Sequence, residues 1–447
     1  MKLWDKGIEV EKLIEKFTIG KDNELDLQLA EFDVLGTIAH IRMLQKMGVI
    51  SELELKKLEY ELIRIYGKIK EGSFRIEEGV EDVHSQIEMI LTDRLGDIGK
   101  KVHTGRSRND QVLVDLKLFI RHEIWKTVEE VKSLFNVMIE QSEKHKHILL
   151  PGYTHFQIAM PSSFGLWFGA YAESLIDDLQ LLLAAYKINN QNPLGSGAGY
   201  GSSFPLDRSY TTQLLGFDTL SYNVVNAQMA RGKVEKIVAF SLASVGSTLS
   251  RLAMDACLFS SQNFKFISFP DNLTTGSSIM PHKKNPDVFE LVRARCNRLQ
   301  GIPAEIGMIL GNLPSGYHRD MQVIKETFIP VFEDLRDSVR MTELMLRNVI
   351  INEHILDDDK YNYLFTVEEV NRLVLEGVPF RDAYKQVARS IQDGTFKSEK
   401  AIRHTHEGSM GNLCNAEIRM KMDTLLAGFE FQKMEASYAN LLQETKM

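Results

Sequence analysis

A long stretch of this chain, from residue 106 to residue 150, contains neither glycine nor proline. Apolar residues recur in it at spacings of three and four, with Thr127 in place of one of them: Leu113, Leu116, Ile120, Ile124, Val131, Leu134 and Met138. This is the period of an amphipathic α-helix. Since thirty helical residues already span about 45 Å, the stretch predicts one long helix that needs packing partners along its whole length.

Four further stretches have the same helical texture: residues 162–189, 233–262, 287–310 and 322–351. Gly301, Pro303 and Pro330 should kink or break two of these helices. Alternation typical of β-strands is scarce, so we expect an all-α fold built on a central bundle of long helices. Apolar stripes of this length commonly continue into neighbouring subunits, which favours an oligomer over a single elongated bundle.

The chain has 447 residues, more than the ~250 to 300 at which a single core stops growing. We therefore expect a central bundle domain between two smaller helical cap domains, with boundaries at residues 1–104, 105–352 and 353–447. A composition of 44% apolar and 26% charged residues is ordinary for a globular protein. The net charge of −8 argues against a nucleic-acid or membrane-surface partner.

The cysteines are few and far apart, and Cys257, Cys296 and Cys414 form no Cys-x-x-Cys pair. Neither a disulfide framework nor a zinc site is expected. His404 and His406 lack a third spaced ligand, so we expect no metal there. The first residues lack the apolar region of a signal peptide, and no apolar run approaches the ~18 residues of a membrane span. These features predict a cytoplasmic protein.

Two polar segments flank the longest predicted helix. Ser107, Arg108 and Asn109 lie just before its apolar part, where donors at a helix start bind anions. The alternative for this segment is an ordinary N-cap with solvated arginines. Thr154 and His155 lie at the bend that follows the helix, and His155 is either a general acid or base or a structural imidazole.

Two more polar segments precede later helices. Residues 275–286 combine glycine and paired serines with Lys283 and Asn285, which can hold an anion beside a helix start. The alternative is a capped surface loop. In residues 315–325, Tyr317, Gln322 and Lys325 share roughly one side if a helix begins near Tyr317, although a solvated polar face would also explain them.

Taken together, these segments resemble a known superfamily. Residues 276–285 fit the loop Gly-Ser-Ser-x-Met-Pro-x-Lys-x-Asn of the fumarase/aspartase superfamily. Residues 105–111 read Gly-Arg-Ser-Arg-Asn-Asp-Gln, which is similar to the argininosuccinate lyases and the related delta-crystallins. The resemblance covers nearly the whole chain. It implies a homotetramer with a central bundle of long helices and active sites built from three subunits.

The resemblance also implies roles for individual residues. Ser277 would be the base, and His155, oriented by Glu290, the other acid/base group. Residues similar to those that hold the succinyl carboxylates are Ser107, Asn109, Thr154, Lys283 and Asn285. Further substrate-binding positions would be His84, Arg108, Arg231, Tyr317, Gln322 and Lys325. The chain departs from the family at residues 21–26, where a serine ahead of Tyr-Asp-Arg is usual, and at His282, where adenylosuccinate lyases also carry histidine.

The implied reaction cleaves argininosuccinate into arginine and fumarate. It removes a proton next to a carboxylate, and the resulting aci-carboxylate needs fixed donors such as Lys283, each typically worth about 3 kcal/mol. Lys283 and loop amides would also hold the Ser277 alkoxide in a closed site. No cofactor is required. The alternatives are another fumarate-releasing lyase of the superfamily, such as adenylosuccinate lyase, and a non-catalytic crystallin-like protein.

Overall fold

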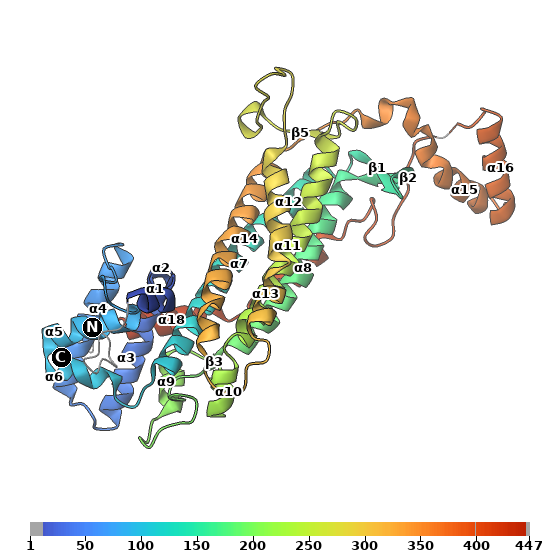
Figure 1. Ribbon diagram of the computed structural model, residues 1–447. Coiled ribbons are helices and arrows are strands. Elements are labelled where there is room, and N and C mark those ends of the chain that lie inside the picture. The colour runs from blue at the N-terminus through green and yellow to red at the C-terminus, as the bar shows by residue number, and fades with distance from the viewer. Residues whose placement is uncertain (1–11, 398, 444–447) are drawn as a thin grey trace.

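Long helices run side by side through the middle of the computed structural model, which describes residues 12–397 and 399–443 (Figure 1). The bundle consists of α7 (Arg108–Lys144), α8 (Phe164–Asn189), α11 (Lys233–Ser260), α12 (Asp287–Leu299), α13 (Ile302–Ile309) and α14 (Ile324–Arg347). The expected all-α fold with a central bundle is confirmed.

The longest helix, α7, begins at a capping box. The Ser107 side chain accepts a hydrogen bond at the helix start, and the Ser107 backbone N–H donates to Asp110 Oδ1 at 2.8 Å. The predicted apolar stripe is buried, and Thr127 joins it by donating its hydroxyl to the Glu123 carbonyl at 2.8 Å. With 37 residues, α7 separates its two ends by about 55 Å.

The long helix ends at Lys144, earlier than the predicted residue 150, because the chain turns into a β-hairpin. Its strands are β1 (Leu149–Thr154) and β2 (Gln157–Ser163), which pair antiparallel around a turn at His155 and Phe156. Both turn residues have positive φ, 53° and 58°. Two short pairs complete the strands: β3 (Gln191–Asn192) with β4 (Thr219–Leu220), and β5 (Ile267–Ser268) with β6 (Ile350–Ile351).

The predicted helix breakers act differently. The chain breaks between α12 and α13 at Gly301, as expected, and Pro303 lies in the first turn of α13. Pro330 does not break its helix, because α14 continues through it, and the alternative of a kink stays a prediction. Pro330 and Glu326, four residues earlier, are both exposed, so the carbonyl that loses its helical donor faces solvent and water can satisfy it.

Smaller helices gather at the end where α7 begins (Figure 1). They are α1 (Lys12–Ile19), α2 (Asp22–Leu25), α3 (Ala30–Lys46), α4 (Glu52–Lys70), α5 (Val83–Leu95), α6 (Asp97–Lys100), α9 (Arg208–Leu214) and α10 (Val224–Met229). The short 3-10 helices are η1 (Asp26–Gln28), η2 (Lys101–His103), η3 (Asp271–Leu273), η4 (Arg319–Gln322), η5 (Ile355–Asp357) and η6 (Asp359–Phe365).

The C-terminal helices extend along the whole bundle. Figure 1 shows α15 (Thr366–Leu375) and α16 (Phe380–Gln392) at the end far from the smaller helices. The chain then returns: α17 (Asn415–Ala427) packs on α8, and α18 (Phe431–Leu441) reaches α3, where Arg42 donates to the Leu441 carbonyl at 3.1 Å. The division at residues 104 and 352 stays a prediction.

Helix α11 lies in the bundle and is strongly apolar. By length and composition it is the one helix, within the described ranges, that passes a test for crossing a membrane. Two thirds of its apolar stretch is buried in the protein, as in the core helix of a bundle. Its apolarity is therefore explained by packing.

Candidate active site

A pocket of about 540 Å³ opens at the end of the bundle where α7 begins. It brings together seven residues singled out in the sequence: His84, Arg108, Asn109, Arg231, Tyr317, Gln322 and Lys325. They come from α5, the start of α7, the turn before α11, and the segment around η4 and α14. One pocket thus unites four separate parts of the sequence.

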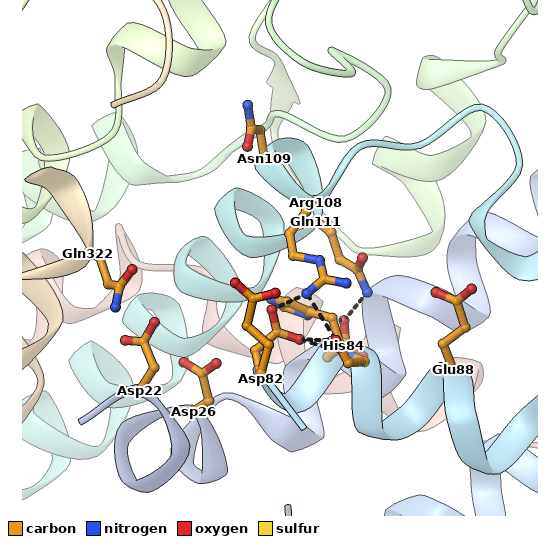
Figure 2. A network of polar contacts seen from close by, with 12 residues as sticks. Asp22, Asp26, Asp82, His84, Glu88, Arg108, Asn109, Gln111 and Gln322 are labelled. Carbon is orange, nitrogen blue, oxygen red and sulfur yellow. Dashed lines mark hydrogen bonds and ion pairs between the residues drawn. The ribbon is translucent and has the colours of Figure 1, made fainter. Parts of the chain in front are cut away.

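Arg108 is held against the start of α5. Its guanidinium pairs with Asp82 and donates to Ser85 Oγ at 3.0 Å, as Figure 2 shows. Asp82 also caps α5 by accepting from the Ser85 backbone N–H at 2.8 Å. Burial alone would raise the pKa of Asp82, but the charges of His84 and Arg108 and its hydrogen bonds bring it below the ordinary value. Asp82 therefore fixes Arg108 as an ion pair.

His84 forms the inner wall of the pocket and is buried between two aspartates. Its Nδ1 lies 2.9 Å from Asp33 Oδ1 and 3.4 Å from Asp115 Oδ2. Gln111 donates to the same Asp33 oxygen at 2.6 Å. Because a carboxylate oxygen accepts, Nδ1 carries the proton, which fixes the ring orientation.

The two aspartates beside His84 have pKa values displaced in opposite directions. Burial would raise the pKa of Asp33, but His84 and Gln111 lower it overall, so Asp33 is ionised. Burial, followed by the charge of Asp33, raises the pKa of Asp115 well above its ordinary value.

Among the described residues, only Asp33, His84 and Asp115 cluster closely enough to hold a metal ion. The hydrogen bond between His84 and Asp33 and the raised pKa of Asp115 account for the cluster without one.

Lys325 and Arg231 bring positive charge to the opposite wall. Lys325 is 5% exposed, and its Nζ lies 2.7 Å from Oδ1 of both Asp22 and Asp26. Arg231 is 3% exposed and its Nε lies 3.5 Å from Glu235 Oε1.

The turn after Arg231 requires glycine. Gly232 has a φ of +79°, and a Cβ there would collide with Leu310. The Gly232 backbone N–H also donates to Glu235 Oε2 at 2.7 Å, so Glu235 orders both the turn and the arginine.

Gln322 ties the N-terminal segment to the pocket. Its amide donates to the carbonyls of Thr18 at 2.8 Å and Ile19 at 3.2 Å, while Arg319 donates to its carbonyl oxygen at 3.1 Å. In Figure 2 the Asn109 side chain points away from the polar network, and it makes no hydrogen bond to any residue in the described ranges. Asn109 is thus left available for a ligand.

Ser107 caps the start of α7. Its hydroxyl accepts from the Asn109 backbone N–H at 3.3 Å, and its predicted contact with a substrate carboxylate stays a prediction. Thr154 and His155 are exposed at the hairpin turn, at the opposite end of α7. There His155 lines a second cavity, of about 710 Å³, with aromatic walls that include Trp167 and Phe259.

The loop between η3 and α12 holds the remaining predicted residues. It closes through a bridge between Thr275 and Asn285, whose amide donates to the Gly276 carbonyl at 3.4 Å. Ser277 Oγ accepts from the backbone N–H of Met280 at 3.2 Å, and Lys283 is exposed. This loop rises beyond β5, at the same end as the β1–β2 hairpin (Figure 1).

Glu290 lies in the first turn of α12, after the loop, and is exposed. Within the described part of the chain, no hydrogen bond or ion pair joins Glu290 to His155. Their pairing stays a prediction. The predicted site residues of one chain therefore form two groups, one at each end of the bundle.

Several lining residues were given no role from the sequence: Glu81, Asp82, Glu88, His103 and Arg319, together with Asp22 and Asp26 of the segment 21–26 that departs from the family. Asp82 could have been found from its place two residues before His84. Asp22 and Asp26 have the spacing of one helical face, which is a weak signal. Burial, Arg106 and Arg108 lower the pKa of His103 to about 4, so this imidazole is neutral near pH 7.

The chain is similar to known lyases over nearly its whole length. A family model described as Lyase matches residues 6–301. The argininosuccinate lyase of Bacteroides fragilis is 62% identical over 441 residues, covering 99% of each chain. That of Thermotoga neapolitana is 38% identical, over 87% of this chain and 97% of the relative. A solved EDDS lyase variant with bound fumarate superposes with a TM-score of 0.74 at 22% identity, over 98% of this chain and 93% of the other, which shows a common fold.

Proposed function

Because the chain belongs to the argininosuccinate lyase family, we propose that it cleaves argininosuccinate into L-arginine and fumarate, in arginine biosynthesis in the cytoplasm. The observation that carries the proposal is the pocket at the start of α7, which collects seven of the residues expected to bind such a substrate. The pocket offers cationic, amide and acidic groups together, as a ligand with carboxylates and a guanidinium requires.

The reaction is an elimination across one carbon–carbon bond. Ser277 takes a proton from the carbon next to a succinyl carboxylate, and the electrons form the double bond of fumarate as the carbon–nitrogen bond breaks. His155, oriented by Glu290, delivers the proton that the departing guanidino nitrogen needs. Lys283, Asn285 and Thr154 stabilise the charge that accumulates on the carboxylate in the intermediate.

Assembly completes the site in this proposal. The pocket residues and His155 lie at opposite ends of α7, about 55 Å apart, so one chain alone holds only part of the constellation. We propose a homotetramer in which each site takes residues from three subunits. The bundle helices carry large exposed apolar side chains that a neighbouring subunit would cover: Leu181, Ile188, Phe240, Met254, Leu291, Met308, Met341 and Leu344.

The proposal is tested by incubating the purified protein separately with argininosuccinate, adenylosuccinate, malate and aspartate and measuring fumarate. Cleavage of argininosuccinate alone, with arginine and fumarate in equal amounts, is the expected result. Faster cleavage of adenylosuccinate would favour the second candidate, another lyase of the superfamily. His282, in the loop of residues 275–286, supports this candidate because adenylosuccinate lyases also carry histidine there. A folded protein that turns over none of the four would be a non-catalytic, crystallin-like relative.

A further inference from the structure

In one corner of the pocket, two carboxylates contact the same ammonium group. Lys325 Nζ lies 2.7 Å from Oδ1 of both Asp22 and Asp26. Asp26 is fully buried, while Asp22 is half-buried and faces the pocket. Figure 2 shows the two carboxylates side by side, with the Gln322 side chain pointing toward Asp22. One acid would neutralise Lys325, so the second is available for another purpose.

The charges of this corner leave an excess of acid. Arg231 pairs with Glu235, so Lys325 is the only base in contact with both Asp22 and Asp26, and this group of three holds one more acid than base. Burial, and then the neighbouring Asp26, raise the pKa of Asp22 to about 6 against the opposing effect of Lys325 and Arg231. Since a desolvated negative charge is costly, a ligand group bound here should bring a positive charge.

Unused hydrogen-bonding groups in the corner define the ligand further. Asp22 Oδ1 contacts Lys325, and no hydrogen bond to Oδ2 is found within residues 12–397 and 399–443. Arg231 lines the pocket with Nη1 and Nε buried and without a hydrogen bond. Asp22 Oδ2 is therefore an acceptor, and Arg231 Nε and Nη1 are donors, that could bind a ligand in this corner of the pocket. A ligand with an ammonium beside a carboxylate satisfies both.

We propose that Asp22 is a specificity-determining residue, whose carboxylate binds the ammonium of a free α-amino-acid group while Arg231 and Lys325 bind the carboxylate of the same group. The inference rests on the proposed function, because the arginine end of argininosuccinate is such a group. Asp22 lies in the segment 21–26, where the chain departs from the usual family sequence. The contact is therefore a property of this chain and of relatives that share the aspartate.

The experiment measures binding to the assembled full-length protein by calorimetry. The probes are L-arginine, δ-guanidinovalerate, which lacks the α-amino group, and agmatine, which lacks the carboxylate. The wild type should bind arginine at least ~tenfold more tightly than either analogue, as expected for a charged hydrogen bond. Asp22→Asn should weaken arginine binding to the level of δ-guanidinovalerate and leave δ-guanidinovalerate unchanged.

Two further variants control for charge and folding. Glu24→Gln removes an exposed acid from the same short helix, outside the pocket, and should behave as the wild type. Asp22→Glu keeps the charge and should keep part of the preference for arginine. Arginine binding that stays the same or tightens in Asp22→Asn would overturn the proposal. Asp22 would then either make no contact with arginine or occupy Lys325 in place of the ligand carboxylate.

The wild type alone supplies an independent test through pH. Asp22 becomes neutral as pH falls through about 6, so the preference for arginine over δ-guanidinovalerate should be lost between about pH 8 and pH 5. The groups facing Asp22 are Lys325, Asp26 and Arg231, and the other titratable lining residues are Glu81, Asp82, His84, Glu88 and His103. Titration of these other groups should affect arginine binding equally in the wild type and in Asp22→Asn. The difference between the two pH profiles therefore reports Asp22 alone. A preference constant over this range would overturn the proposal.

Failure of the Asp22 proposal and failure of the proposed function give different results. Turnover of argininosuccinate with no effect of Asp22→Asn on arginine binding defeats only this inference. Arginine binding that depends on Asp22, in a protein without turnover, defeats only the proposed function.

Discussion

The imidazole of His84 and the carboxylate of Asp33 form a fully buried pair, with Nδ1 and Oδ1 2.9 Å apart, in the wall of the pocket. Asp115 approaches the same imidazole nitrogen from α7 at 3.4 Å. The pKa of Asp33 is displaced below its ordinary value, and the pKa of Asp115 is displaced well above it. Replacing each by asparagine should therefore have opposite consequences for stability.

Asp33→Asn should lower the thermal midpoint at pH 8. The pKa of Asp33 is lowered by folding, so its stabilisation is present above its unfolded value of about 4 and is lost as pH falls through the folded value. Loss of the charged acceptor should cost about 1–3 kcal/mol.

Asp115→Asn should leave the midpoint at pH 8 unchanged or raise it. The pKa of Asp115 is raised by folding, so the wild type loses stability as pH rises from about 4 toward the folded value, and an amide does not titrate. Equal destabilisation by both substitutions, measured by calorimetric scans at pH 5 and pH 8, would contradict the opposite displacement of the two pKa values.

Ser277→Ala should keep fold and assembly but lower turnover by several orders of magnitude, because the hydroxyl would act as the base. In the folded chain this hydroxyl accepts only backbone N–H groups of its own loop, so its loss should not disturb the bundle. The matched control is Ser278→Ala, which removes the adjacent exposed hydroxyl. Steady-state rates of Ser277→Ala within threefold of wild type would remove Ser277 from the mechanism.

His155→Ala and Glu290→Gln should each reduce turnover and displace the pH–rate profile, because one residue is proposed to orient and charge the other. His147→Ala, which removes an exposed histidine just before the hairpin, is the control. The readout is kcat against pH for the three variants. Profiles that coincide with that of the wild type in both active-site variants would rule out the pairing.

Phe240→Glu should dissociate the tetramer and abolish turnover together. Phe240 lies on α11 and is 60% exposed in the single chain, so a charge there would be buried at the proposed subunit interface. The control is Tyr60→Glu, at a comparably exposed aromatic (58%) on α4. Sedimentation velocity gives the mass of each species. An active tetramer of Phe240→Glu would exclude the bundle face around this residue from the interface.

Local periodicity explains how much of the fold could be predicted. The start and apolar stripe of α7 follow from the sequence, because a helix of this length repeats its pattern many times. Its end could not be predicted, since residues 145–150 contain no breaker and the hairpin is decided by pairing with β2. The return of α17 and α18 along the bundle likewise depends on tertiary packing.

Local sequence likewise predicts only part of the candidate site. Polar segments at helix ends contain five of the seven pocket residues, because reactive groups cluster where loops meet helix ends, and His84 and Arg231 came from the family resemblance. The bond between Lys325 and Asp26 joins positions 299 apart, and no periodicity or spacing reports a contact of that range. Asp33 and Asp115 lie within helices that otherwise look like ordinary core segments, so their burial beside His84 emerges only in three dimensions.

The measurement that tests the account most directly is complementation between two inactive variants. Asn109 lies at the first turn of α7 and His155 beyond its last, so one chain cannot bring both to one site. If Asn109→Ala and His155→Ala chains are unfolded together and refolded at equal ratio, each residue of a shared site comes from an intact chain with probability one half. About a quarter of wild-type activity should return. Well-mixed tetramers that recover no activity would contradict a site shared between subunits.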